Sequence, residues 1–242
     1  MAYRDELTKE TLRVYERYAV EVVERFGFCP WARASRESQS AAVRVIFSVN
    51  RDDFADSLQL IAQLSTPATE RDRVDVALLV YPLLDLDRLD FEDFGRRLRG
   101  ADDARSNLSG EFAMAAFHPT AAADLSHPDR LVPYIRRTPD PTLQLVRKSV
   151  LSSIKGLEQG TAFVDLDALS AAGFQKLREP PQAKAVRDLI AEQNLATVLQ
   201  VSSAVIDPIL EDILRDREQA HAKLYDRHRA RGPKRAGPSS AL

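Results

Sequence analysis

The sequence has little of what most recognised catalytic and binding motifs require. Its 242 residues include a single cysteine, Cys29, and only 9 glycines. One cysteine excludes an intrachain disulfide, which fits a reducing compartment. No glycine-rich phosphate loop, dinucleotide fingerprint, Gly-x-Ser-x-Gly elbow or paired-cysteine zinc signature is present. A functional site must therefore be assembled from scattered residues.

The sequence also lacks long apolar runs and a strong charge imbalance. No apolar run approaches the roughly 20 residues that span a bilayer. The first ten residues, MAYRDELTKE, have no apolar core and do not resemble a secretory signal. The net charge of −2 gives no global field towards nucleic acid or an acidic membrane. We therefore expect a cytoplasmic protein with neither a membrane nor a nucleic-acid partner.

Hydrophobic spacing predicts alternating helices and strands in the first part of the chain. A helical pattern from Leu12 to Phe26 stops at Gly27. Strands are predicted at 43–49, 74–81 and 112–117, separated by a helix capped by Asp52 or Asp53 and by a short helix marked by Phe91, Phe94 and Leu98. This alternation predicts an α/β fold with a small, partly parallel sheet of three or more strands and flanking helices.

The second part of the chain has a different pattern. Residues 120–135 are predicted as a loop, and a helix marked by Leu143, Val146, Val150 and Ile154 is predicted to begin at Thr138 or Asp140. After Gly160, Pro180-Pro181 and Asp207-Pro208 each indicate a helix start, and Ile209, Ile213, Leu214 and Leu224 form an apolar stripe. We predict an α/β core at 1–156, an all-helical extension at 157–228, and a disordered basic tail at 229–242.

Cys29 lies in a Phe-Cys-Pro-Trp turn after the first predicted helix. A thiolate there would serve as a nucleophile or as a soft ligand for haem or a metal ion. A helix C-terminus disfavours a thiolate, so the stabilising charge must come from elsewhere in the fold. The structural alternative is a small apolar side chain packed between Phe28 and Trp31.

His118 directly follows the third predicted strand, and Tyr81 ends the second. Ligands of open α/β sheets bind beyond the carboxyl ends of the strands. If these two strands are parallel, both side chains emerge at one edge, where His118 is placed as a general base or a ligand. The structural alternative is a histidine hydrogen-bonded to a neighbouring loop.

Arg136 and Arg137 precede the helix predicted to start near Thr138. An arginine beside the free N–H groups of a helix start is suited to a carboxylate or a phosphate. We therefore predict that Arg137 and Thr138 bind a small anionic molecule. The structural alternative is pairing of the arginines with loop carboxylates such as Asp140.

Three segments together resemble a bacterial family, the domain-of-unknown-function family numbered 1415. Phe28-Cys29-Pro30-Trp31-Ala32 is similar to its Leu-Cys-Pro-Phe-Ala, and Phe117-His118-Pro119 to its Phe-His-Pro. Residues 137–143 are similar to its Arg-Ser-Pro-Tyr-Pro-Thr-Leu, and Arg147 falls where the family also has an arginine. The resemblance implies that Cys29, His118 and Arg137 belong to one set. Gln144 and Tyr81 stand where the family has histidines, so a metal held by those histidines would be lost here.

Three functions follow from these patterns. The first is a small-molecule enzyme, with Cys29 and His118 as catalytic residues and an anionic substrate bound by Arg137, Thr138, Tyr81 and Arg147. The second is a protein that binds haem or a single metal ion through Cys29, with His118 or Tyr81 opposite. The third is a non-enzymatic protein that forms a homodimer through its C-terminal helix.

Overall fold

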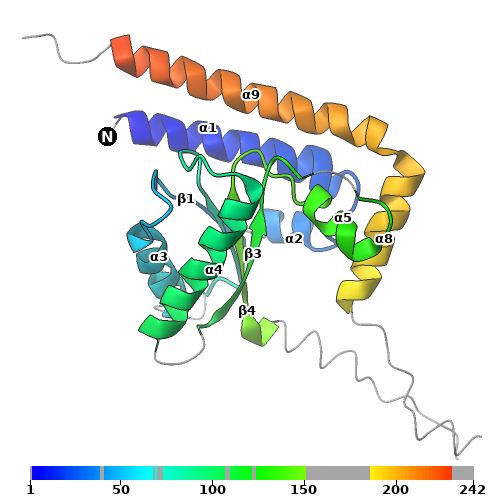
Figure 1. Ribbon diagram of the computed structural model, residues 1–242, viewed down its shortest axis with the longest axis horizontal. Coiled ribbons are helices and arrows are strands. Elements are labelled where there is room, and N and C mark those ends of the chain that lie inside the picture. Colours follow the sequence, from blue (N-terminus) through cyan, green and yellow to red (C-terminus); the bar gives the residue numbers. More distant parts are fainter. Residues whose placement is uncertain are drawn as a thin grey trace, which may run out of the picture.

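The computed structural model describes residues 2–38, 41–67, 69, 73–106, 110–121, 124–150 and 186–230. Its centre is a four-stranded sheet with the strand order β1-β2-β4-β3 (Figure 1). The strands are β1 (Ala41–Val45), β2 (Val76–Val80), β3 (Phe112–Phe117) and β4 (Thr142–Arg147). The expected α/β class is thereby confirmed.

The sheet is partly parallel. Strand β1 pairs in parallel with β2, whereas β4 lies antiparallel between β2 and β3. β1, β2 and β3 therefore run in one direction, and their carboxyl ends meet at the edge where β4 begins. We call this edge the carboxyl edge.

Two helices, α3 (Ala55–Ser65) and α4 (Arg88–Arg105), cover one face of the sheet (Figure 1). The Asp87 side chain caps α4 by accepting a 2.8 Å hydrogen bond from the N–H of Asp90. Apolar residues three and four positions apart on α4 meet alternate residues of the strands. The resulting core includes Ile61, Leu79, Phe91, Phe94, Leu98, Leu143 and Leu145.

A second apolar cluster joins helices from the two ends of the chain. Its elements are α1 (Ala2–Tyr18), the π-helix η1 (Ala19–Glu24), α5 (Pro128–Ile135), α8 (Val186–Val201) and α9 (Ser203–Ala230), with Phe28. Helices α1 and α9 lie side by side over the sheet (Figure 1). The apolar stripe predicted on the C-terminal helix is confirmed as buried at Ile213 and Leu224, while Ile209 and Leu214 are half-buried. We call the contact between these two helices the α1–α9 seam.

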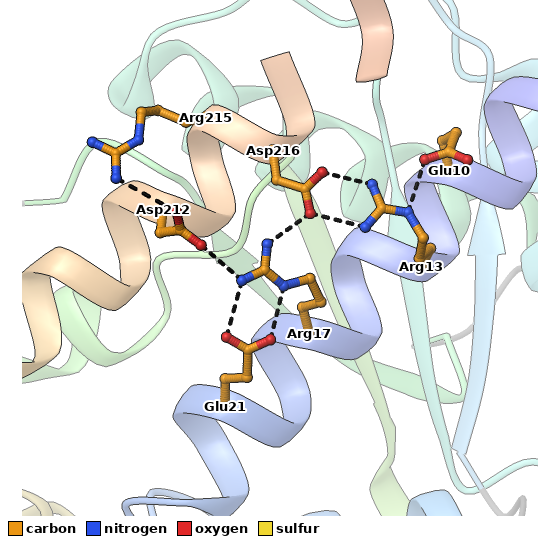
Figure 2. A network of polar contacts seen from close by, with 7 residues as sticks. All are labelled: Glu10, Arg13, Arg17, Glu21, Asp212, Arg215 and Asp216. Carbon is orange, nitrogen blue, oxygen red and sulfur yellow. Dashed lines mark hydrogen bonds and ion pairs between the residues drawn. The ribbon is translucent and has the colours of Figure 1, made fainter. Parts of the chain in front are cut away.

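Ion pairs line the outside of the α1–α9 seam (Figure 2). Asp216 of α9 accepts hydrogen bonds from Arg13 at 2.7 Å and from Arg17 at 2.6 Å. Arg17 also pairs with Asp212 and with Glu21. The two arginines hold the pKa of the Asp216 carboxyl well below its usual range. Partly exposed pairs contribute about 0.2–1 kcal/mol each, so this network mainly fixes the register of α9 on α1.

The helix predicted to begin at Thr138 or Asp140 is wrong over residues 142–147, which form strand β4 in the middle of the sheet, whereas residues 148–150 are helical. Leu143 and Val146 suggested a helical period, but Leu143 and Leu145 follow the period of two that a strand requires. Both point into the core. Pairing on both sides, with β2 and β3, outweighs the local pattern.

The predicted loop at 120–135 is also wrong over its second half, which forms α5. Pro128 occupies the first turn, where a missing N–H has no cost, and His127 caps the helix by accepting from the N–H of Asp129. Helix α4 has 18 residues and is longer than predicted, and α9 begins at Ser203 with Pro208 inside it. The cap of α3 is Phe54, although the Asp53 carboxylate accepts from the N–H of Ala55.

Several predictions concern residues outside the described part of the chain. These are the helix start at Pro180-Pro181, the boundary between 156 and 157, Ile154, and the tail from 231 onwards. Among the described residues, no single helix combines the length and apolar character needed to cross a membrane. A bent pair, Asp188–Val201 and Ser203–Arg229 at 96°, passes that test by length and composition only.

Candidate functional site

Tyr81 and His118 emerge at the carboxyl edge, because β2 and β3 run in the same direction. The segment leading into β4 fixes both residues. The N–H of Tyr81 donates to Pro141 O at 2.9 Å, and the N–H of His118 donates to Arg136 O at 3.1 Å. The edge is therefore a rigid framework made by three loops.

A cleft of about 230 Å³ opens beside His118, between α4, β3 and α5. Ala115, Ala116 and Ala121 supply the space, because their side chains are small. The polar lining consists of His118, Arg88, Glu92 and Arg136, and Val132 and Pro133 complete the wall. With a neutral histidine, these groups carry a net charge of +1.

Both ring nitrogens of His118 have partners within the chain. Nε2 lies 3.0 Å from the carbonyl oxygen of Leu86, which only accepts, so Nε2 carries the proton and donates. Nδ1 is then the acceptor, 3.0 Å from the hydroxyl of Thr120 and 3.3 Å from its N–H. Burial lowers the pKa of His118 from its ordinary value, so the imidazole is neutral at pH 7.

The two arginines of the cleft come from different elements. Arg88, in the first turn of α4, forms an ion pair with Glu92 one turn later. The Arg136 guanidinium lies over the Phe117 ring, 5.0 Å from its centroid. Arg88 and Arg136 are the two arginines that line the cleft together with His118.

Arg137 and Thr138 do not line this cleft. Arg137 donates to Pro119 O at 3.2 Å and to Asp207 of α9 at 2.9 Å. The structural alternative, in which the arginine pairs with a carboxylate, therefore agrees with the structure except that the carboxylate is Asp207 and not Asp140. Thr138 is fully buried and donates to Asp140 O at 2.7 Å. Both residues line a cavity of about 10 Å³, which is at the lower limit for one water molecule. The helix start that the predicted anion site required does not exist.

Tyr81 and Arg147, also predicted to bind substrate, both have hydrogen-bond partners within the chain. The Tyr81 hydroxyl lies 2.9 Å from the Ser57 hydroxyl inside the apolar core, where burial raises the pKa of Tyr81. Arg147 is at the far end of β4, and its guanidinium donates to the carbonyls of Val74 and Leu64. Six strand residues separate Arg147 from the carboxyl edge by about 17 Å, so it belongs to another part of the molecule.

Cys29 lies in the predicted turn, which follows Gly27 at a φ of 67°. A positive φ favours glycine, which explains why the helix ends there. Cys29 as a whole residue is half-buried. Cys29 is not among the residues that line the His118 cleft, and its proximity to His118 stays a prediction. Among the residues described, no three of the His, Cys, Asp and Glu side chains are grouped so as to hold a metal ion.

The sequence did not predict that the buried carboxylate of Asp140, at the carboxyl edge, pairs with Arg217. Asp140, which is 1% exposed, accepts from Nε of Arg217 in α9 at 2.7 Å. Nη2 of the same arginine donates to Pro82 O at 3.0 Å. His221 follows one turn later on α9, and its Nε2 is buried without a partner. The signal was present, because Arg217 and His221 continue the stripe between Ile213 and Leu224.

Fold and site together define an α/β protein with a cleft beside a neutral histidine at the carboxyl edge of its sheet. The chain belongs to the family described as Protein of unknown function (DUF1415), which matches residues 11–165, more than half of its length. Helices α8 and α9 lie beyond the matched residues. No curated protein and no solved structure matches the chain.

Proposed function

We propose that the protein is a small-molecule enzyme whose anionic substrate binds in the cleft beside His118. The observation that carries this proposal is the grouping of His118 with Arg88 and Arg136 around one open cleft. The cleft is smaller than the 300–1,000 Å³ typical of ligand pockets. A compact carboxylate or phosphate therefore fits it better than a nucleotide.

His118 supplies the proton-transfer group in this proposal. A neutral imidazole at pH 7 has the protonation state of a general base. The proton would be accepted at Nδ1, because Nε2–H is committed to the Leu86 carbonyl. Nδ1 has the more replaceable partner, since Thr120 is exposed and its hydroxyl can turn to water.

Arg136 and Arg88 supply the recognition of charge. A guanidinium binds a carboxylate or a phosphate through two parallel hydrogen bonds. Glu92 already pairs with Arg88, so an anion would compete with Glu92 there. We assign the binding of the anion to both arginines, because both line the cleft.

Calorimetric titration with inorganic phosphate, acetate and citrate tests the binding step. We expect saturable binding of at least one anion, weakened at least tenfold by Arg136→Gln. Arg130→Gln is the matched control, because Arg130 belongs to the neighbouring helix α5, does not line the cleft and has a side chain that is 70% exposed. Binding that Arg136→Gln leaves unchanged, or no saturable binding at all, would contradict the proposal.

Cys29 keeps its predicted roles as nucleophile or as haem or metal ligand, which the absorption spectrum of the purified protein separates. A Soret band would favour the haem-binding alternative. The predicted homodimer rested on the apolar stripe of the C-terminal helix. Helix α1 covers that stripe within the chain, so we propose no dimer.

A further inference from the structure

Asp140 and Pro82 place two hydrogen-bond acceptors side by side at the carboxyl edge. The Arg217 guanidinium bridges them, with 2.7 Å to Asp140 Oδ1 and 3.0 Å to the Pro82 carbonyl. Both acceptors lie within the family-matched residues, whereas Arg217 comes from α9, beyond the match. The two acceptors therefore belong to the family-matched part of the chain, and the guanidinium that binds them belongs to the C-terminal helix.

Hydrogen bonds within the α/β core hold the backbone around the two acceptors. Thr138 and Thr142 both donate their hydroxyls to the backbone carbonyl of Asp140, at 2.7 Å and 2.9 Å. The Tyr81 N–H, next to Pro82, donates to Pro141 O. Preorganised acceptors bind a cation at lower entropic cost than mobile ones.

Arg217 leaves part of this acceptor pair unused. Its Nε and Nη2 both approach Oδ1 of Asp140, and Oδ2 is buried without any hydrogen-bond partner. A free guanidinium is not tied to a helix and could place parallel donors on both carboxylate oxygens, the stronger geometry. Because the residue is 99% buried, its unpartnered oxygen can accept a second hydrogen bond from a ligand that Arg217 does not supply.

We propose that Asp140 and the Pro82 carbonyl form a recognition site for a guanidinium group, and that Arg217 occupies this site in the free protein. The ligand is a guanidinium compound or the arginine side chain of a peptide. It displaces only the Arg217 side chain, which is 24% exposed and can turn to solvent. The apolar contacts of α9 stay in place.

Calorimetry on the full-length Arg217→Ala protein tests the site, with ethylguanidinium as the probe. We expect saturable binding, at least tenfold tighter than to the wild type, where Arg217 competes. Adding Asp140→Asn should abolish it. Arg215→Ala is the matched control, because Arg215 is a neighbouring, 61% exposed arginine of α9, and it should bind ethylguanidinium as weakly as the wild type.

Ethylammonium at equal ionic strength distinguishes guanidinium recognition from general cation binding. Agmatine and an arginine-centred tripeptide distinguish a small-molecule ligand from a peptide. Equal binding of ethylguanidinium by Arg217→Ala and by the double variant, or none by either, would overturn the proposal. If Arg217→Ala does not fold, Arg217→Gln takes its place, and its melting temperature should rise by about 3 °C at tenfold the Kd of ethylguanidinium.

Discussion

Buried polar side chains in the sheet core and at the α1–α9 seam differ in their hydrogen bonding. In the core, Tyr81, Thr142 and Arg147 all have partners. Within the described residues, four buried side-chain atoms have none, namely Thr11 Oγ1, Asp140 Oδ2, His221 Nε2 and His228 Nε2. Three lie on α1 or α9, and the fourth belongs to the carboxylate that pairs with Arg217 of α9.

Substitutions of buried polar side chains should therefore affect stability differently in the sheet core and at the α1–α9 seam. A buried polar group without a hydrogen-bond partner costs about 1–3 kcal/mol of stability. Replacing such a group by an apolar one should therefore stabilise the protein at the seam, whereas the paired groups of the core offer little stabilisation of this kind. The seam joins α1 to a helix that lies beyond the family-matched residues. We therefore expect substitutions of buried polar side chains to destabilise the protein less at the seam than in the sheet core.

Arg147→Met should produce the largest loss of stability. It removes a guanidinium that donates to Val74 O and Leu64 O and lies over the Phe112 ring. We expect the free energy of unfolding to fall by about 3 kcal/mol in a urea titration. Arg96→Met, at a 70% exposed position of α4, should change it by under about 0.5 kcal/mol. Equal effects of the two substitutions would contradict the claim that the hydrogen bonds of Arg147 stabilise the sheet core.

The same substitution at two buried threonines should have opposite effects. Thr138→Val breaks the hydrogen bond to Asp140 O and should destabilise the protein by about 1 kcal/mol. Thr11→Val removes a buried hydroxyl that has no partner and should stabilise it by about 1 kcal/mol. Both can be measured by urea unfolding. Destabilisation by Thr11→Val would show that the seam hydroxyl is satisfied in solution.

Acidification should weaken the seam through His221. Burial, and to a lesser extent Arg217, lowers its pKa from 6.5, while Asp140 and Glu10 oppose the shift. The unfolded chain then takes up the proton first, so stability is complete above about pH 6.5 and falls as the pH drops through the folded value. The free energy of unfolding between pH 7.5 and 5 should decline less in His221→Gln. An unchanged decline would contradict this assignment.

Cys29 should give the smallest effect. Because Cys29 is only half-buried, iodoacetamide should label it in the native protein, and Cys29→Ser should alter stability by under about 1 kcal/mol. Mass spectrometry follows the labelling. Labelling only after denaturation, in a sample without a Soret band, would show that Cys29 is a packed core residue.

The sequence allowed prediction of the parts whose signals are local. The apolar runs predicted strand 112–117 and most of β1 and β2. The position of Tyr81 and His118 at one edge followed from the assumption that the strands before them are parallel. Strand β4 was missed because its partners, β2 and β3, are remote in sequence. Asp140 and Arg217 lie 77 positions apart, and no spacing rule joins residues so distant.

The most direct test of the proposed anion site is NMR spectroscopy of the His118 imidazole during titration with inorganic phosphate. His118 lines the cleft and its Nδ1 has an exchangeable partner, so we expect a saturable shift of its ring signals at pH 7.5. The shift should be lost in Arg136→Gln and retained in Arg130→Gln. His118 signals that stay fixed while the protein binds phosphate elsewhere would contradict the assignment of this cleft as the substrate site.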